Sequence, residues 1–159
     1  MGSIARFSAL ERFEQEFGER LTKHFSYLIG QTVTGFSDTE VEYWVRADVA
    51  LSGGEVFEVH HRWATEEESY EGKEILEEGD ITMNEWLNEY AKGQAVTSVS
   101  IGNADRDDEA YLFLTLENGN SLECRLGYHS EDGTVYGLAK EILSEEEIKA
   151  FEEKENNRY

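Results

Sequence analysis

The sequence predicts an α+β domain in which a long N-terminal helix packs on a curved antiparallel sheet of about six or seven strands, with a short middle helix and a short C-terminal helix. Three observations support this fold class. Apolar residues recur every three or four positions over residues 4–28, two-residue alternation dominates the segments that follow, and short turns connect those segments. Tight turns join antiparallel strands, whereas parallel strands need long crossovers.

The first element is predicted to be one amphipathic helix over about residues 4–28. Its apolar side is formed by Ile4, Phe7, Leu10, Phe13 or Phe17, Leu21, Phe25 and Leu28. This spacing aligns side chains along one side of a helix. Gly30 follows as the expected residue of the C-terminal cap.

The sheet is predicted from alternating segments bounded by turn residues. These segments span residues 32–36, 41–51, 57–63, 95–101, 110–117, 121–128 and 134–142. Ser52-Gly53-Gly54-Glu55 and Asn118-Gly119 have the composition of hairpin turns. Residues 111–116 carry apolar side chains on both faces of the predicted strand, so this strand should be the most buried.

Two short helices are predicted from start signals. Each has a capping box, in which a hydroxyl and a carboxylate satisfy free backbone amides, and a hydrophobic staple across the first turn. The boxes are Thr82 with Glu85 and Ser144 with Glu147, and the staples are Ile81 with Trp86 and Leu143 with Ile148. Leu87 and Tyr90 should continue the apolar face of the middle helix, and Gly93 should end it. The tail from Glu152 to Tyr159 should fray.

Length and composition favour one soluble domain spanning residues 1–159, with Met1-Gly2-Ser3 as a candidate cloning remnant. A single cysteine excludes an internal disulfide, and neither a signal peptide nor a long apolar run is present, so we expect a cytoplasmic protein. Thirty-five acidic residues oppose fourteen basic ones, giving a net charge of −21. This charge argues against direct binding to nucleic acid or to an anionic membrane.

The acidic charge is densest in residues 65–80, where eight acids accompany one lysine. We expect an exposed loop there, with a short edge strand around Ile75-Leu76. The segment is either a solvated loop that maintains solubility or a surface that recognises a basic partner. The candidate partner-binding residues are Glu66, Glu67, Glu68, Tyr70, Glu71, Glu74, Glu77, Glu78 and Asp80, with Asp105, Asp107 and Asp108 from the 103–109 loop. Glu11, Glu14, Asp38, Glu40 and Glu42 are candidates to extend this surface.

Three other groups of residues carry weaker signals for chemistry. In residues 57–63, Glu58, His60 and Arg62 should share one face, with Phe57, Val59, His61 and Trp63 on the other. Glu58 and His60 would give a metal only two ligands. The Asn103–Glu109 loop resembles a calcium loop but lacks its glycine and distant glutamate. Cys124 lies among apolar neighbours, where a thiol is inert. We therefore expect neither metal nor cofactor.

The helix-then-meander order is similar to that of the cystatin-like and NTF2-like architectures, a resemblance of topology that implies nothing about function. The leading hypothesis is a non-enzymatic acidic inhibitor that neutralises a basic, nucleic-acid-handling partner. It would be an immunity protein against a nuclease toxin, or a phage-borne DNA mimic that blocks restriction or CRISPR machinery. The alternative is a ligand-binding or enzymatic pocket using His60, His61, Tyr43 or Trp63. A third hypothesis is that the charge serves solubility alone.

Overall fold

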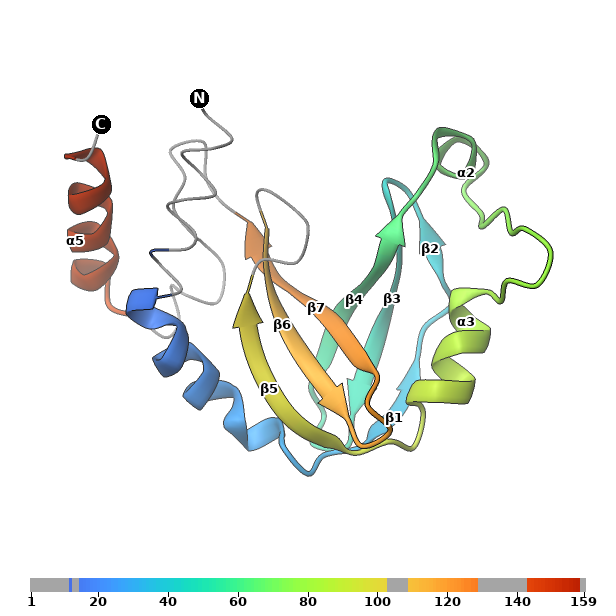
Figure 1. The fold of residues 1–159 in the computed structure, drawn as a ribbon, viewed down its shortest axis with the longest axis horizontal. Coiled ribbons are helices and arrows are strands. Elements are labelled where there is room, and N and C mark those ends of the chain that lie inside the picture. The colour runs from blue at the N-terminus through green and yellow to red at the C-terminus, as the bar shows by residue number, and fades with distance from the viewer. Residues whose placement is uncertain (1–11, 13–14, 103–108, 129–142, 158–159) are drawn as a thin grey trace. The chain divides into compact units, whose positions relative to one another are not determined.

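The computed structural model describes residues 12, 15–102, 109–128 and 143–157 (Figure 1). Contacts divide the chain into two compact units. The first unit comprises residues 1–26, 100–112 and 126–159, and the second comprises residues 27–99 and 113–125. Three of the four boundaries between the units fall inside strands, and the fourth falls inside the 3₁₀ turn at residues 25–28.

An antiparallel sheet of seven strands confirms the predicted α+β class. Its strands are β1 (Val33–Phe36), β2 (Glu40–Val41), β3 (Trp44–Leu51), β4 (Val56–Trp63), β5 (Val96–Gly102), β6 (Glu109–Leu116) and β7 (Ser121–Tyr128). Their order is β1-β3-β4-β7-β6-β5, with β2 also paired to β3. The predicted strand over residues 134–142 lies outside the described residues.

The start of β1 meets the start of β5, although these strands stand at opposite ends of the sheet order. An isolated bridge pairs Thr32 with Ala95. Beside it, the Gly30 N–H donates to the Val96 carbonyl, and the Val96 N–H donates to the Gln31 carbonyl, each at 2.8 Å. Within the second unit, the segment before β1 is therefore hydrogen-bonded to the start of β5.

Among the side chains that the structure describes, those of β6 are the most buried of any strand, as its apolar composition predicts. Tyr111, Leu112, Leu114 and Leu116 have almost no exposed surface. In strand order β6 lies between β7 and β5, so hydrogen-bonding neighbours occupy both of its sides. Apolar side chains on both faces suit a strand in that position.

A β-bulge at His61 changes the predicted alternation of β4. Val45 pairs with Arg62, but the next residue, Arg46, pairs with His60, which leaves His61 as an extra residue. Glu58 and His60 share a face as predicted. The prediction that Arg62 joins them is wrong, because the extra residue moves Arg62 to the face of the fully buried Val45.

The long N-terminal helix is not confirmed as predicted. Helix runs over residues 15–24 and continues as the 3₁₀ turn Phe25–Leu28. Of the predicted residues before position 15, only Arg12 lies among the described residues, and it is helical. Gly30 has a φ of 94°, the left-handed conformation expected after a helix end.

The C-terminal helix α5 (Glu145–Asn156) belongs to the first unit, where it contributes to a small apolar core. The core contains Phe17, Leu21, Leu143, Ile148 and Phe151, with Ile101 packed against it. The predicted capping box is confirmed: the Ser144 hydroxyl accepts from the Glu147 N–H, and Glu147 accepts from the Ser144 N–H, both at 3.1 Å. The prediction that the chain frays from Glu152 is wrong, because α5 continues to Asn156. Buried Phe151 anchors the turn that follows it.

The middle helix begins at the predicted cap, Thr82, as α3 (Met83–Trp86) and continues as the π-helical turn η2 (Leu87–Ala91). Buried Met83, Leu87 and Ala91 recur at four-residue spacing, whereas Tyr90, predicted to lie on the apolar face, is partly exposed. Gly93 follows with a φ of 83°. Among the helices of the described residues, none is long and apolar enough to span a membrane.

Candidate functional site

Residues 65–80 contain a helix, so the predicted exposed loop is wrong at its start. Helix α2 (Glu66–Glu71) follows β4 and is capped by Thr65. The Thr65 hydroxyl accepts from the Glu68 N–H, and the Glu68 carboxylate accepts from the Thr65 N–H, both at 3.1 Å. Three glutamates in the first turn also complement the helix dipole. Residues 75–76 form no strand.

Glu68 is buried, with a residue exposure of 1%. Arg62 from the end of β4 donates to both of its oxygens, at 2.7 Å from Nη1 and 2.6 Å from Nη2. The Ile75 N–H donates to the same carboxylate at 3.0 Å. These hydrogen bonds, led by those of Arg62, outweigh desolvation and lower the pKa of Glu68 to about 2. Glu68 therefore ties β4, α2 and the following segment together.

Glu74 has a second structural role. Its side chain is 8% exposed and lies 3.8 Å from Nη2 of Arg62. Both carboxylate oxygens accept from the Met83 N–H, at 3.0 and 3.2 Å, at the start of α3. A carboxylate at this position satisfies a free amide of the first helical turn and favours the helix dipole. Glu68 and Glu74 thus face inward, away from the surface proposed for partner binding.

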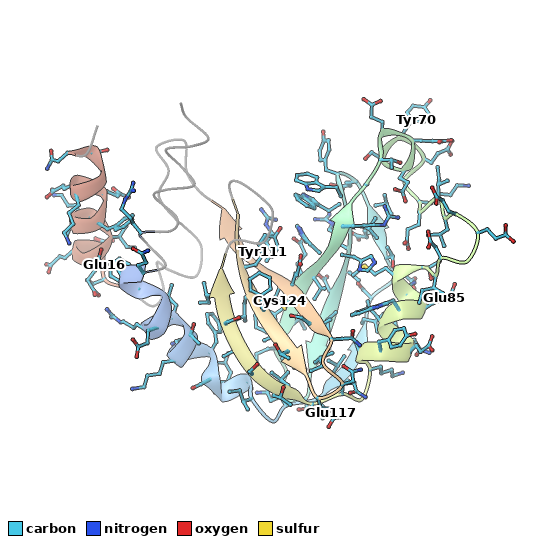
Figure 2. The ribbon with its side chains drawn as sticks, in the orientation of Figure 1. Glu16, Tyr70, Glu85, Tyr111, Glu117 and Cys124 are labelled. Atoms are coloured by element: carbon cyan, nitrogen blue, oxygen red, sulfur yellow. The ribbon has the colours of Figure 1, made fainter. Side chains whose placement is uncertain are left out.

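The remaining acids of the segment stay on the surface. Glu66, Glu67, Glu71, Glu77, Glu78 and Asp80 are exposed. Within the described part of the chain, none of these six carboxylates forms an ion pair. Tyr70 projects from α2 among them with 90% of its surface exposed (Figure 2). We call these six carboxylates and Tyr70 the acidic surface.

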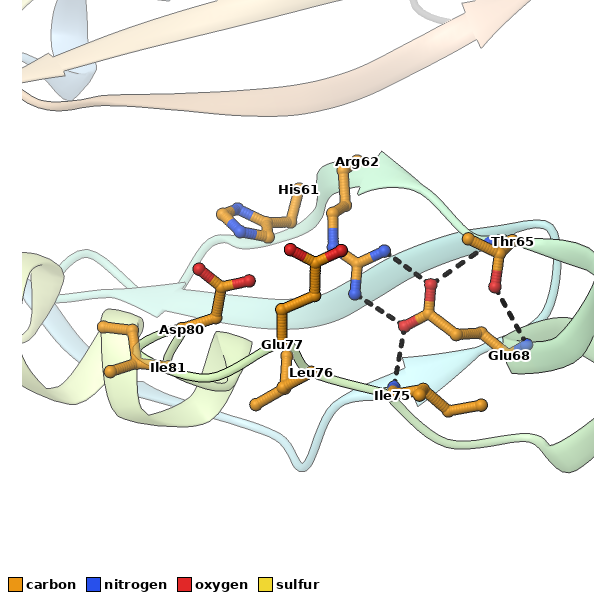
Figure 3. A pocket seen from close by; sticks show the side chains of 9 residues that line it. All are labelled: His61, Arg62, Thr65, Glu68, Ile75, Leu76, Glu77, Asp80 and Ile81. Carbon is orange, nitrogen blue, oxygen red and sulfur yellow. Dashed lines mark hydrogen bonds and ion pairs between the residues drawn. The ribbon is translucent and has the colours of Figure 1, made fainter.

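A cavity of about 560 Å³ opens beside the acidic surface, between β4, α2 and the segment that leads to α3 (Figure 3). It is lined by His61, Arg62, Thr65, Glu68, Ile75, Leu76, Glu77, Asp80 and Ile81. Figure 3 shows the carboxylates of Glu77 and Asp80 extending toward His61 and Arg62. The cavity therefore combines aliphatic side chains with acidic groups.

The balance of charge in the cavity is negative. Arg62 is its one cationic lining residue, and Glu68 occupies both of its terminal nitrogens. Desolvation, and then the charge of Arg62, lower the pKa of His61, so its ring is neutral at pH 7. The charge of Asp80 helps to raise the pKa of Arg62, but neither Glu77 nor Asp80 forms an ion pair with a described residue.

A second hollow, of about 500 Å³, is lined by Glu42, Tyr43, Ser69 and Tyr70. The Ser69 hydroxyl donates to the Glu42 carbonyl and links α2 to the segment before β3. Tyr43 is 74% exposed. Because Glu68 and Ser69 are successive residues of one helix, the two hollows border different sides of α2.

Glu58 and His60 form a polar cluster on the face of the sheet that carries Arg46. Nε2 of His60 lies 2.7 Å from the Glu58 carboxylate, and Arg46 and Arg125 lie 2.9 and 3.4 Å from it. Desolvation is the largest single effect on the pKa of Glu58 and raises it. The combined lowering by His60 and the two arginines is greater, so the pKa of Glu58 is below its usual value. No group of three or more candidate metal ligands occurs in the described residues. The Glu58 carboxylate is paired on several sides, but Nε of Arg46 and Nε of Arg125 are buried without a hydrogen-bond partner among the described residues.

The structure separates the residues of the alternative pocket hypothesis. His61 lines the cavity and Tyr43 lines the second hollow, whereas His60 is buried. Trp63 stacks on Trp44, with ring centroids 3.4 Å apart. Neither of these two hollows in the described part of the chain is lined by more than one of the four side chains.

Other predicted residues fall elsewhere. Cys124 is buried, and desolvation raises the pKa of its thiol, as expected for an inert cysteine. Glu40 and Glu42 are exposed and lie 3.2 and 3.7 Å from Arg46, whereas exposed Asp38 forms no ion pair with a described residue. Asp105, Asp107, Asp108, Glu11 and Glu14 lie outside the described residues.

Sequence reasoning missed two features of the site. The Thr65–Glu68 capping box has the same spacing as the two boxes that were recognised, so a signal was present. Arg62 carried no signal, because its role depends on the bulge at His61.

Comparisons with protein-family models, curated proteins and solved structures give no match.

Proposed function

We propose that this chain is a non-enzymatic inhibitor that binds a basic, nucleic-acid-handling protein through the acidic surface. The partner would be a nuclease toxin, making the chain an immunity protein, or a component of restriction or CRISPR machinery, making it a DNA mimic. Carboxylates would occupy the lysine and arginine positions that otherwise hold phosphates, and inhibition would be competitive.

The observation that carries this proposal is the set of six exposed carboxylates with no ion-pair partner in the described residues. Like charges held together destabilise a fold, so a cluster without internal neutralisation favours an external cation. Tyr70, Ile75 and Leu76 are exposed within the same stretch. Aromatic and aliphatic side chains supply the desolvated contacts that charge alone lacks.

The rigidity of the segment supports the same proposal. Arg62, Glu68 and Glu74 fix α2, the following segment at Ile75 and the start of α3 through hydrogen bonds of 2.6–3.2 Å. A solvated loop that served solubility alone would need no such anchoring. A fixed array of charges loses less conformational entropy on binding, which strengthens association.

The test is affinity capture from the native host at about 50 mM and about 500 mM salt, because exposed charge pairs are screened at high ionic strength. The chain should retain a basic nucleic-acid-binding protein at low salt and release it at high salt. The purified partner should then lose nuclease or DNA-binding activity when the chain is added. Retention of no basic protein, or retention that ignores ionic strength, would contradict the proposal.

A second candidate function is binding of a small cationic ligand in the cavity. The favouring observation is its size, about 560 Å³, together with lining by His61 and carboxylates. This candidate predicts saturable binding of small amines with no protein partner, measured by calorimetry at low salt. Inhibition of a captured protein would instead favour the first proposal.

A further inference from the structure

We propose that the cavity receives one arginine or lysine side chain of the partner, which makes this cavity the specificity-determining site within the acidic surface. The inference rests on the proposed function, because the occupant belongs to the basic protein that the chain is proposed to bind. It adds a defined anchor to an otherwise general attraction between opposite charges.

The lining matches the two parts of such a side chain. Arginine and lysine carry an aliphatic stem that favours apolar contact and a charged head that favours anions. Ile75, Leu76 and Ile81 supply aliphatic surface, and each is about 40% exposed. Glu77 and Asp80 extend into the same space as anionic acceptors (Figure 3).

The charge of the lining disfavours an anionic ligand in the cavity. An anion would need a free cationic donor, but both terminal nitrogens of Arg62 are already bonded to Glu68. Three carboxylates face the single arginine among the lining residues. No other basic residue of the chain lines the cavity within the described residues, so the cation must come from outside.

The volume also suits a side chain that arrives on a polypeptide. At about 560 Å³ the cavity lies within the size range of small-molecule pockets and exceeds what one side chain fills. Space remains for the backbone beside the anchor. Buried anchors of this kind concentrate binding energy in protein interfaces, and arginine is among the most frequent.

The experiment titrates the full chain with a capped Gly-Arg-Gly peptide and, as a neutral isostere, the matching citrulline peptide. Amide chemical shifts in NMR spectra report the site of binding. The arginine peptide should shift the signals of residues 75–81 and 61–62 saturably, and the citrulline peptide should bind about tenfold more weakly or not at all. Equal binding of both peptides would overturn the inference.

A matched pair of variants separates the cavity from general charge. Glu77→Gln with Asp80→Asn neutralises the cavity, and Glu66→Gln with Glu67→Gln removes the same charge from α2 outside it. The cavity variant should weaken arginine-peptide binding about tenfold, and the α2 variant less than about threefold. Equal weakening would overturn the cavity inference while leaving the proposed function intact. Failure of the unmodified chain to inhibit any captured basic protein would remove the proposed function itself.

Discussion

Arg62 and Glu68 form a two-pronged ion pair in which each terminal nitrogen of the guanidinium donates to a different carboxylate oxygen, at 2.7 and 2.6 Å. Glu68 is 1% exposed, whereas about a third of the Arg62 side chain remains exposed. The pair joins the end of β4 to α2 and forms one wall of the cavity (Figure 3). The position of the acidic surface therefore depends on it.

Removing Arg62 should destabilise the fold more than removing its partner. Arg62→Met leaves a buried carboxylate without its counter-ion, which should lower the free energy of unfolding by about 3 kcal/mol. Glu68→Gln leaves a partly exposed arginine that water can solvate, so a loss of about 2 kcal/mol is expected. Urea denaturation measures both losses.

The two losses should not add. Once Arg62→Met has broken the pair, adding Glu68→Gln removes the buried charge that caused most of the damage. The double variant should therefore be more stable than the sum of the single losses indicates. Simple additivity would show that the two side chains contribute independently, contrary to the geometry.

Stability should fall in acid because of Glu68. Its pKa is about 2 in the folded chain and 4.5 without its partners, so folding favours the ionised form. The contribution is complete above about pH 5 and is lost as the pH falls toward 2, on the order of 3 kcal/mol. Urea denaturation between pH 6 and pH 2 measures the slope.

Glu68→Gln should flatten that pH dependence, because the variant carries no titrating group at this position. Glu78→Gln serves as the control, since Glu78 is exposed and its side chain has no ion-pair partner in the described residues. The control should keep the slope of the unmodified chain. An unchanged slope in Glu68→Gln would mean that other carboxylates cause the acid sensitivity.

Helix α2 should depend on its cap. Thr65→Ala removes the acceptor for the Glu68 N–H and should cost about 1 kcal/mol of unfolding free energy. Thr65→Ser keeps the hydroxyl and should restore most of that loss. Thermal or urea unfolding distinguishes the two, and equal losses for alanine and serine would exclude a capping role.

The Cys124 thiol should be unreactive while the chain is folded. Complete burial raises its pKa, so the nucleophilic thiolate is scarce at pH 8 and reagents cannot reach it. A colourimetric disulfide reagent should modify the native chain at least about a hundredfold more slowly than the urea-unfolded chain, in line with the rarity of global opening. Fast modification of the native chain would contradict the assigned burial.

Local signals in the sequence predicted the sheet well. Alternation in residues 41–51 and 121–128 was enough to predict two strands, and the capping boxes were enough to predict two helix starts. Each of these signals acts over only a few residues. The predicted box forms in full at Ser144. At Thr82 the hydroxyl accepts from the Glu85 N–H as predicted, but the Glu85 carboxylate accepts from that hydroxyl and not from the Thr82 N–H. The bulge at His61 was not predictable from period-two alternation, because only the register against β3 defines the extra residue.

The acidic segment shows where composition misleads. Counting its charges predicted an exposed loop, since few residues seemed able to pack. Glu68 and Glu74 are instead the residues that anchor it, because a buried carboxylate is stable when an arginine and several amides saturate its oxygens. That pairing depends on Arg62, six residues before Glu68 and on another element, which composition does not reveal.

The central claim is that the acidic surface takes the place of a nucleic acid on a basic partner. The most direct measurement is equilibrium competition between the chain and a labelled duplex for the purified partner, at low salt. The chain should displace the duplex completely. Neutralising Glu66, Glu67 and Glu71 with glutamine should weaken displacement about tenfold. A ternary complex of chain, duplex and partner, or full displacement by the neutralised variant, would contradict it.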